Sequence, residues 1–248
     1  MIIFYLFLIL SDGKKYRSKR CGIYCEWNYI SENKTLKILG EGDMKDWKNE
    51  EEIPWNIYSN ETETIEIDNE ITSIGSYSFS NFYKLKNLTL GYGLMNIGKQ
   101  AFENCISLQN FKIPYYIDDI KYKTFYNCSS LTELEFPSLI KIEKHSFSFC
   151  TSLESIRFKN TVEIIENKSF SNCSSLQSIE YYGLYEPKCS SKIFSHLNKL
   201  KKIIVSHHYE NSFFCKKLIK RIPTKYYSPL NSIVNYFYDP LTSIIEIN

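Results

Sequence analysis

The chain has 248 residues, of which 43% are hydrophobic, and 30 basic and 28 acidic side chains give it a formal charge of +2. This hydrophobic content can bury a core and excludes wholesale disorder. The nearly balanced charge excludes a global attraction to nucleic acids or other polyanions. With 20 Tyr and 16 Phe but only 9 Gly and 7 Pro, the composition suits stacked strands joined by few flexible linkers.

The first ten residues, MIIFYLFLIL, form the one long apolar run of the chain. A helix that crosses a bilayer needs about 20 apolar residues, so this run is too short to span one. It is typical of the apolar segment of a secretory signal, and a buried N-terminal strand is the alternative. We expect residues 1–20 to be a signal peptide and a charged linker, and we expect no transmembrane span later in the chain.

A region without repeats follows, from residue 21 to residue 64. The segments WNYI and TLKILG have strand composition and are separated by a short polar turn, which predicts a β-hairpin across Ser31 to Lys34. Trp27, Trp47 and Trp55 supply large apolar anchors. We expect this unit to be a capping β unit, because an uncapped solenoid exposes its core and a strand edge.

A repeat occupies residues 65–205, and phenylalanines mark it at steps of 23, 23, 22, 23 and 24 residues. Leucine follows each of them after six positions, and apolar residues follow after nine and eleven. This period, with leucines framing a short strand, is the signature of a leucine-rich-repeat solenoid. The phenylalanines are Phe79, Phe102, Phe125, Phe147, Phe170 and Phe194.

We therefore predict a mainly β fold with short helical or 3-10 turns, built from about six repeats of 22–24 residues. Each repeat begins with a weaker strand of the pattern I-x-x-I, for example Ile71 and Ile74. All these apolar columns must point inward, because one repeat cannot bury its own apolar face. Residues 206–248 are expected to form a C-terminal cap and tail, whose last residues are either one or two strands or a loose segment.

Two polar columns accompany the phenylalanines. Cysteine recurs three residues after them, and we interpret this column as small buried thiols rather than a metal or disulfide ladder, since side chains of one column point the same way. Asparagine recurs two residues after them, and an amide at this turn can bond the backbone of its neighbours. The columns are Cys105, Cys128, Cys150 and Cys173, and Asn81, Asn104, Asn127 and Asn172.

The other four cysteines lie in the two caps. Cys21 with Cys25 and Cys189 with Cys215 are the economical disulfide pairs in an oxidising compartment. Six N-x-[ST] sequons add support for secretion, at Asn33, Asn60, Asn87, Asn127, Asn167 and Asn172.

Nothing in the sequence has the pattern of an active site. A zinc site could be assembled from His196, His207 and His208 with Cys189 and Cys215, but their spacing matches no standard finger. No Gly-rich phosphate loop, no HExxH and no calcium loop occur, and no nucleophile has an orienting group. The sequence predicts a chain that is not an enzyme and has no metal or cofactor.

Binding is the remaining class of function. In each main strand the residue between two inward positions turns outward, and the outward residues carry mixed charge without a basic stripe. Such a surface favours a protein or glycoprotein partner over nucleic acid, although any solvated repeat face has the same composition. The outward columns are Thr89, Lys112, Glu135, Arg157, Glu180 and Ile204, flanked by Asn87, Asn110, Glu133, Ser155, Ser178 and Lys202. Eight of them are the candidate binding residues: Thr89, Lys112, Glu135, Arg157, Glu180, Asn110, Glu133 and Lys202.

The segments IGKQAFENCISLQNFKIP and TFYNCSSLTELEFP resemble the repeat of the BspA-like leucine-rich-repeat surface proteins. The leader CGIYCEWNYI, the strand TLKILGEGDM and the Pro54-Trp55 pair resemble the N-terminal unit of that family. The resemblance implies a non-catalytic cell-surface or secreted protein that mediates adhesion or binds a host or matrix protein. A cytoplasmic scaffold is the alternative, and a metal-dependent enzyme at the C-terminal Cys/His group is a remote one.

Overall fold

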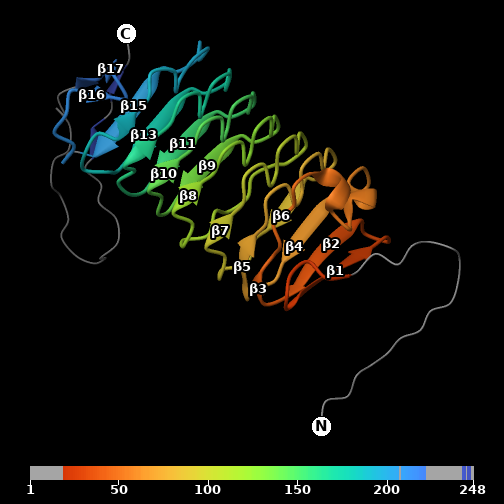
Figure 1. Ribbon diagram of the computed structural model, residues 1–248. Coiled ribbons are helices and arrows are strands. Elements are labelled where there is room, and N and C mark those ends of the chain that lie inside the picture. Colours follow the sequence, from red (N-terminus) through yellow and green to blue (C-terminus); the bar gives the residue numbers. More distant parts are fainter. Residues whose placement is uncertain (1–18, 207, 222–241, 244, 247–248) are drawn as a thin grey trace, which may run out of the picture.

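The computed structural model describes residues 19–206, 208–221, 242–243 and 245–246. The described chain winds into a solenoid whose turns lie side by side along one axis, with a cap at each end (Figure 1). The apolar run at residues 1–10, predicted to be a signal, lies outside the described residues.

One row of parallel strands runs along the solenoid, almost one strand per turn. In this row Leu134, Ile156 and Ile179 stand opposite one another in neighbouring strands and are buried. Alternation along each strand then exposes the residues between the buried ones. The leucine-rich-repeat architecture predicted from the sequence is confirmed. The strands are β4 (Thr64–Ile67), β6 (Asn87–Thr89), β9 (Glu133–Phe136), β11 (Ser155–Phe158), β13 (Ser178–Tyr181) and β15 (Lys202–Ser206).

A second row is made by the shorter I-x-x-I strands. These strands are also parallel, and Ile142 pairs in register with Ile120 on one side and Ile165 on the other. The row comprises β5 (Ile71–Ile74), β7 (Asn96–Ile97), β8 (Asp119–Ile120), β10 (Lys141–Ile142), β12 (Ile164–Ile165) and β14 (Lys188–Cys189).

Both rows are interrupted near the turn that carries Phe111. Residues 108–114 form no strand, so the strand predicted there is wrong. The first row is therefore divided into two sheets, which end at β6 and at β9, and the second row into two sheets, which end at β7 and at β8. At this step the side-chain Oδ1 of Asn110 accepts the backbone N–H of Thr132 at 3.2 Å and of Glu133 at 3.1 Å. An amide side chain thus replaces the main-chain acceptor that a strand would supply.

A third line of backbone hydrogen bonds joins the turns without forming strands. The N–H of Phe79 donates to the carbonyl of Ala101 at 2.8 Å. In the next two turns the N–H groups of Phe102 and Phe125 make the equivalent bonds to Thr124 and Ser146, each at 2.9 Å. Because it crosses the turn of Phe111, this loop ladder is continuous where both rows of strands are interrupted.

Two left-handed residues in each of the first five turns, and one in the sixth, give the loop ladder its shape. Backbones with positive φ are uncommon for residues other than glycine and are easiest for asparagine. Here they recur at two fixed positions, with φ between 53° and 65°. The first position holds Tyr77, Gln100, Lys123, His145 and Lys168, and the second holds Asn81, Asn104, Asn127, Phe149, Asn172 and His196.

The asparagine column therefore has a different role from the one expected. In the first three turns its amides bond one another rather than the backbone: Nδ2 of Asn104 donates to Oδ1 of Asn81 at 2.7 Å, and Nδ2 of Asn127 donates to Oδ1 of Asn104 at 3.0 Å. Asn172 donates instead to Oγ of Ser171 at 3.2 Å. Asparagine fits the column because it tolerates the left-handed backbone and also joins this chain of amides.

Stacked phenylalanines form the centre of the core. The ring centroids of Phe79, Phe102, Phe125, Phe147 and Phe170 follow one another at 5.3 to 5.4 Å, and all five side chains are buried. The inward columns are confirmed with four exceptions that pack on the core but stay partly exposed: Leu90, Phe111, Phe194 and Leu200.

The cysteine column is buried among these rings. The thiol of Cys128 donates to the carbonyl of Phe102 at 3.3 Å, and Cys105 makes the same bond to Phe79. Burial raises the pKa of the Cys105 thiol, so it stays neutral. All four thiols of the column are free in the structure, and they fill the core as hydrogen-bonded small groups.

The N-terminal cap is the predicted hairpin with tryptophans behind it. Strand β1 (Cys25–Ile30) is antiparallel to β2 (Thr35–Gly40), and β2 is parallel to β4. Trp55 is buried against Phe79 with ring centroids 6.0 Å apart, and its Nε1–H donates to the carbonyl of Ser78 at 2.8 Å. The unit also contains β3 (Gly42–Asp43) and the 3-10 turns η1 (Glu50–Glu52) and η2 (Asn56–Tyr58).

At the other end, antiparallel strands terminate the first row. Strand β15 pairs with β19 (Thr242–Ser243) and β20 (Ile245–Glu246), and β18 (Lys220–Arg221) pairs with β20. A small hairpin of β16 (Phe213–Phe214) and β17 (Lys217–Leu218) precedes them, and its buried Phe214 lies against Phe194 and Tyr181.

Replacing Asn104 separates the two roles of the asparagine column. We expect Asn104→Gly to lose the amide chain but keep the left-handed backbone, at a cost of about 1–2 kcal/mol. Asn104→Ala loses the same bonds and adds strain, so we expect about 1 kcal/mol more. Urea unfolding of both variants measures the difference, and an alanine variant as stable as the glycine one would contradict the conformational role.

Candidate functional site

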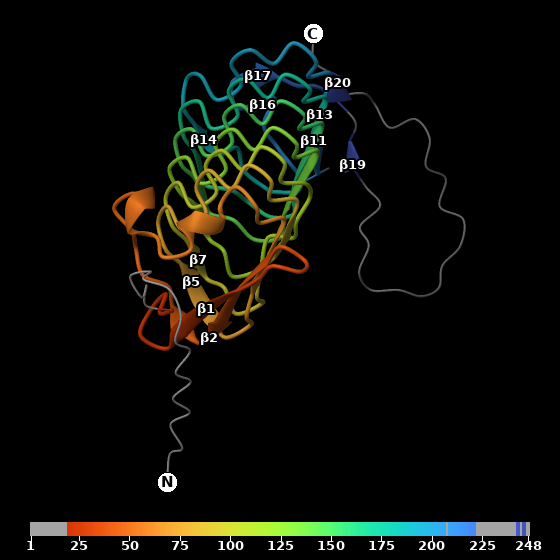
Figure 2. The same ribbon diagram turned by 90° about the vertical axis from the view of Figure 1, so that its right-hand side faces the viewer.

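Strands β11 and β13 of the first row lie along one side of the solenoid (Figure 2), and we call the surface made by the outward residues of the row the strand face. Strand pairing places its central column in register on both sides of the interrupted turn. The column holds Lys37, Glu66, Thr89, Lys112, Glu135, Arg157, Glu180 and Ile204.

Lys37 and Glu66 were missed by the sequence analysis. Lys37 belongs to β2, so the capping hairpin extends the strand face by one strand beyond the repeats, and its Nζ lies 2.7 Å from a carboxylate oxygen of Glu66. The alternation in TLKILG and TIEI was the available signal, because it continues the inward and outward pattern of the repeats.

Arg157 is at the centre of the charged part of this column. Its Nε and one terminal nitrogen donate to the carboxylate of Glu180 at 2.5 and 3.1 Å, and the other terminal nitrogen donates to Glu135 at 3.1 Å. The hydrogen bonds from Arg157 hold the pKa of Glu180 below its usual value, and bonds to Glu180 raise the pKa of Arg157. These three predicted binding residues are therefore already paired with one another.

A hollow of about 180 Å³ lies beside this ion-paired group. It is located where the row of strands is interrupted, and apolar and charged side chains share its lining. The lining residues are Asn110, Phe111, Glu133, Leu134, Glu135, Ser155, Ile156, Arg157 and Glu180.

The structure thus brings five of the eight predicted site residues into one place and leaves three outside it. Asn110, Glu133, Glu135, Arg157 and Glu180 line the hollow. Thr89 and Lys112 are exposed on the strand face beyond this lining, and Lys202 is exposed on β15. Repeat columns predicted the face, but the hollow depends on the missing strand, which the sequence analysis did not foresee.

The cap cysteines lie at the two ends of the solenoid. Cys21 is disulfide-bonded to Cys25 and Cys189 to Cys215, with Cα atoms 5.2 and 5.1 Å apart. The second bond occupies two of the side chains from which a zinc site could be assembled, and His207 lies outside the described residues. Within the described ranges no group of three or more His, Cys, Asp or Glu residues is arranged to hold a metal ion.

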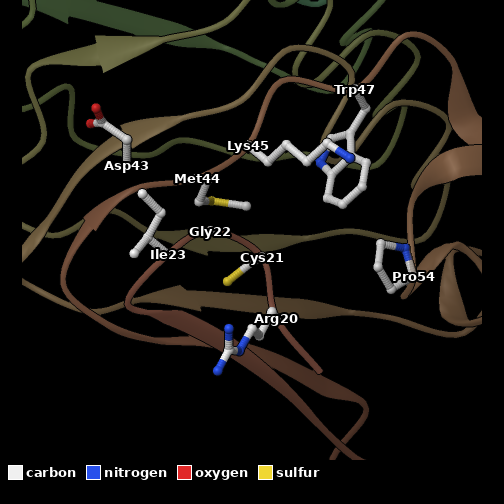
Figure 3. A pocket seen from close by; sticks show the side chains of 9 residues that line it. All are labelled: Arg20, Cys21, Gly22, Ile23, Asp43, Met44, Lys45, Trp47 and Pro54. Carbon is white, nitrogen blue, oxygen red and sulfur yellow. The ribbon is translucent and has the colours of Figure 1, made fainter. Parts of the chain in front are cut away.

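A larger pocket of about 500 Å³ lies in the N-terminal cap (Figure 3). The Nζ of Lys45 is 4.8 Å from the centroid of a Trp47 ring, and Met44 and Ile23 border the same space. Its nine lining residues include one carboxylate, Asp43, and no histidine or hydroxyl.

The repeats match a family model described as "BspA type Leucine rich repeat region" in six copies, over residues 51–177 and 140–248. The chain belongs to the BspA-type leucine-rich-repeat family. Among curated proteins none matches this BspA-type chain.

Two bacterial structures share the fold of this BspA-type solenoid. A leucine-rich-repeat protein of T. pallidum is 19% identical, with a TM-score of 0.53, and the match covers 65% of this chain and 81% of that one. A leucine-rich cell surface protein of Faecalibacterium prausnitzii is 20% identical with a TM-score of 0.55, over 85% of this chain and 60% of that one. At these identities the likeness shows the fold alone.

Removing the cation from the ion-paired group tests its electrostatics. We expect Arg157→Met to raise the pKa of Glu180 and to cost at most about 1 kcal/mol at neutral pH, because the pair is partly exposed. The folded pKa of Glu180 is lowered, so this stabilisation is present above its unfolded pKa and is lost as the pH falls through the folded value.

Carboxylate NMR titration and urea unfolding at neutral and acid pH measure both effects. Lys112→Met is the control, since it removes an exposed cation of the same face. A stability loss for Arg157→Met that is equal at both pH values would contradict the electrostatic account.

Proposed function

We propose that this chain is a non-catalytic binding solenoid that holds a protein partner against its strand face, centred on the hollow beside Arg157. The observation that carries the proposal is the hollow itself, where the partly exposed ring of Phe111 is bordered by an ordered group of charges. Interfaces combine such an apolar centre with a polar rim.

The size of the strand face supports the same partner class. Neighbouring strands lie about 4.8 Å apart, so the six turns extend over about 25–30 Å. Standard protein interfaces bury about 800 Å² on each partner, which this length accommodates. A small molecule would find a shallow hollow rather than an enclosing pocket.

We further propose that the protein acts outside the cell, at a surface or in secreted form, in adhesion to a host or matrix protein. Disulfides in both caps suit an oxidising compartment. The F. prausnitzii relative in fold is titled a cell surface protein. In the described part of the chain, no helix has the length and hydropathy to cross a membrane. Antibody staining of intact, unpermeabilised source cells tests this location, and signal only after permeabilisation would contradict it.

The binding test neutralises the charges of the hollow and compares them with a matched set. Glu135→Gln, Arg157→Gln and Glu180→Gln remove two anions and one cation from the strand face. Glu143→Gln, Lys141→Gln and Glu166→Gln remove the same charges from the second row, where Lys141 bridges the two carboxylates at 3.1 and 3.0 Å.

Each full-length variant is tested for binding to a panel of purified matrix proteins by surface plasmon resonance. We expect the strand-face variant to lose about tenfold or more in affinity, because polar contacts at the centre of an interface are lost, and the second-row variant to bind normally. Equal binding by both variants, with thermal midpoints unchanged, would dismiss the strand face as the site.

The alternative of an intracellular scaffold differs in its cysteines. Export predicts four titratable thiols in the denatured, unreduced protein isolated from its source, because Cys21, Cys25, Cys189 and Cys215 are bonded. Cytosolic residence predicts eight. Alkylation followed by mass spectrometry gives the count, and eight alkylated cysteines would overturn the proposed location without touching the proposed binding face.

A further inference from the structure

Lysines gather along a corner of the solenoid that the strand-face hypothesis does not use. Each of five consecutive turns places a lysine without an ion pair within three residues after the end of its second-row strand, and Lys123 in the same region is ion-paired with Glu103 at 2.8 Å. Figure 2 shows β14 of this row on the opposite side of the molecule from β11 and β13. We call these residues the basic corner: Lys99, Lys121, Lys144, Lys168 and Lys192.

The ammonium groups of the basic corner form no ion pair in the described part of the chain, although Lys121 and Lys99 help the hydrogen bonds from Ser76 to lower the pKa of Asp46. Among the described residues, no carboxylate oxygen lies within 4.0 Å of any of the five. The nearby carboxylates are otherwise engaged: Glu143 and Glu166 share Lys141 and accept the backbone N–H groups of Tyr122 and Lys144 at 2.8 and 3.1 Å.

Neighbouring groups respond to the positive field of this corner. His145 has its pKa lowered by burial and then by the charges of Lys144, Lys168 and Lys123. An imidazole that is kept neutral adds no charge of its own, so these lysines define the field along the middle turns.

The basic corner ends in a pocket of about 330 Å³ at the C-terminal cap. Lys192 and three serines of the last turn form one wall, and Lys216 and Lys217 of the β16–β17 hairpin form the other. No carboxylate belongs to the lining, although Glu186 accepts the backbone N–H of Lys216 nearby at 3.4 Å. Ammonium and hydroxyl groups together are the donors that sulfate and phosphate oxygens accept. The serines are Ser190, Ser191 and Ser195.

We propose that the basic corner and this Ser/Lys pocket bind a linear sulfated polysaccharide that runs along the solenoid axis. Neighbouring second-row strands lie about 4.8 Å apart, and each turn adds its lysine one to three residues beyond its strand, so the positive charge follows the solenoid axis. A line of charge complements one anionic chain better than it complements a flat membrane.

A nucleic acid would also be attracted by the positive charge, but the rest of the surface suits it less well. Single-stranded nucleic acids stack their bases on exposed aromatic rings. Along the corner Tyr122 and Tyr126 each form a T-shaped contact with His145. The Nζ of Lys123 lies 4.5 Å from the centroid of Tyr126, so these rings are partly occupied, although Tyr122 stays 36% exposed.

The test removes three charges from the corner and compares a matched loss elsewhere. The corner variant is Lys144→Gln, Lys168→Gln and Lys192→Gln, and glutamine suits the left-handed position of Lys168 because Gln100 occupies it three repeats earlier in the same column, with φ 56°. The control is Lys84→Gln, Lys199→Gln and Lys201→Gln, three exposed lysines that precede first-row strands.

Binding of a size-defined heparin oligosaccharide to each full-length protein is measured by calorimetry at low and physiological salt. We expect the dissociation constant to rise about tenfold or more for the corner variant and less than about twofold for the control. We also expect binding to the wild type to weaken with salt, since ionic contacts are screened.

Three results would overturn the proposal: an equal loss in both variants, undiminished binding of chemically desulfated heparin, or tighter binding of single-stranded DNA of equal charge. Circular dichroism checks that both variants are folded. The strand-face variant should keep its heparin affinity, so this site and the proposed protein-binding face fail or succeed separately.

Discussion

The loop ladder is the constraint on which the rest of the molecule depends. It fixes the distance between successive turns through main-chain bonds that no side chain can alter, such as that from Phe102 to Thr124. Identical side chains then meet at one spacing, which is why the phenylalanine rings stack at 5.3 to 5.4 Å over five turns. The left-handed positions at the edges of the ladder explain why asparagine recurs there. Cysteine recurs because its thiol donates a hydrogen bond to the carbonyl of a phenylalanine.

Because this ladder is continuous, the strands need not be. Where residues 108–114 leave the first row, the turn is still held by loop hydrogen bonds and by the amide of Asn110. Phe111 stays partly exposed there, against Phe125 at 4.9 Å, and contributes the apolar floor of the hollow. A uniform solenoid would show a flat strand face, so local irregularity rather than the repeat itself creates the candidate binding site.

The sequence predicted what repeats in side-chain type and could not predict what repeats only in backbone conformation. The phenylalanine, leucine and strand columns were readable because burial demands apolar residues at fixed steps. The first left-handed position holds Tyr77, Gln100, Lys123 and His145 in successive turns, and these residue types carry no common signal. The interruption at Asn110 was equally hidden, since LQNFKIP alternates like any other strand of the chain. The charged column was predicted, but its pairing through Arg157 depends on distances between strands.

The two candidate surfaces differ most clearly in whether their charges are paired. On the strand face Arg157 is bonded to Glu135 and Glu180, so a partner that covers this group removes water from charges that are already paired with one another. Burying such a pair costs desolvation, and it is tolerated only if every hydrogen bond survives, which favours a partner of complementary shape. The basic corner differs, because its ammonium groups form no ion pair in the described part of the chain and can each bind an anion. The strand face should therefore be selective and only weakly dependent on salt, whereas the corner should bind any sufficiently sulfated chain and release it as salt rises.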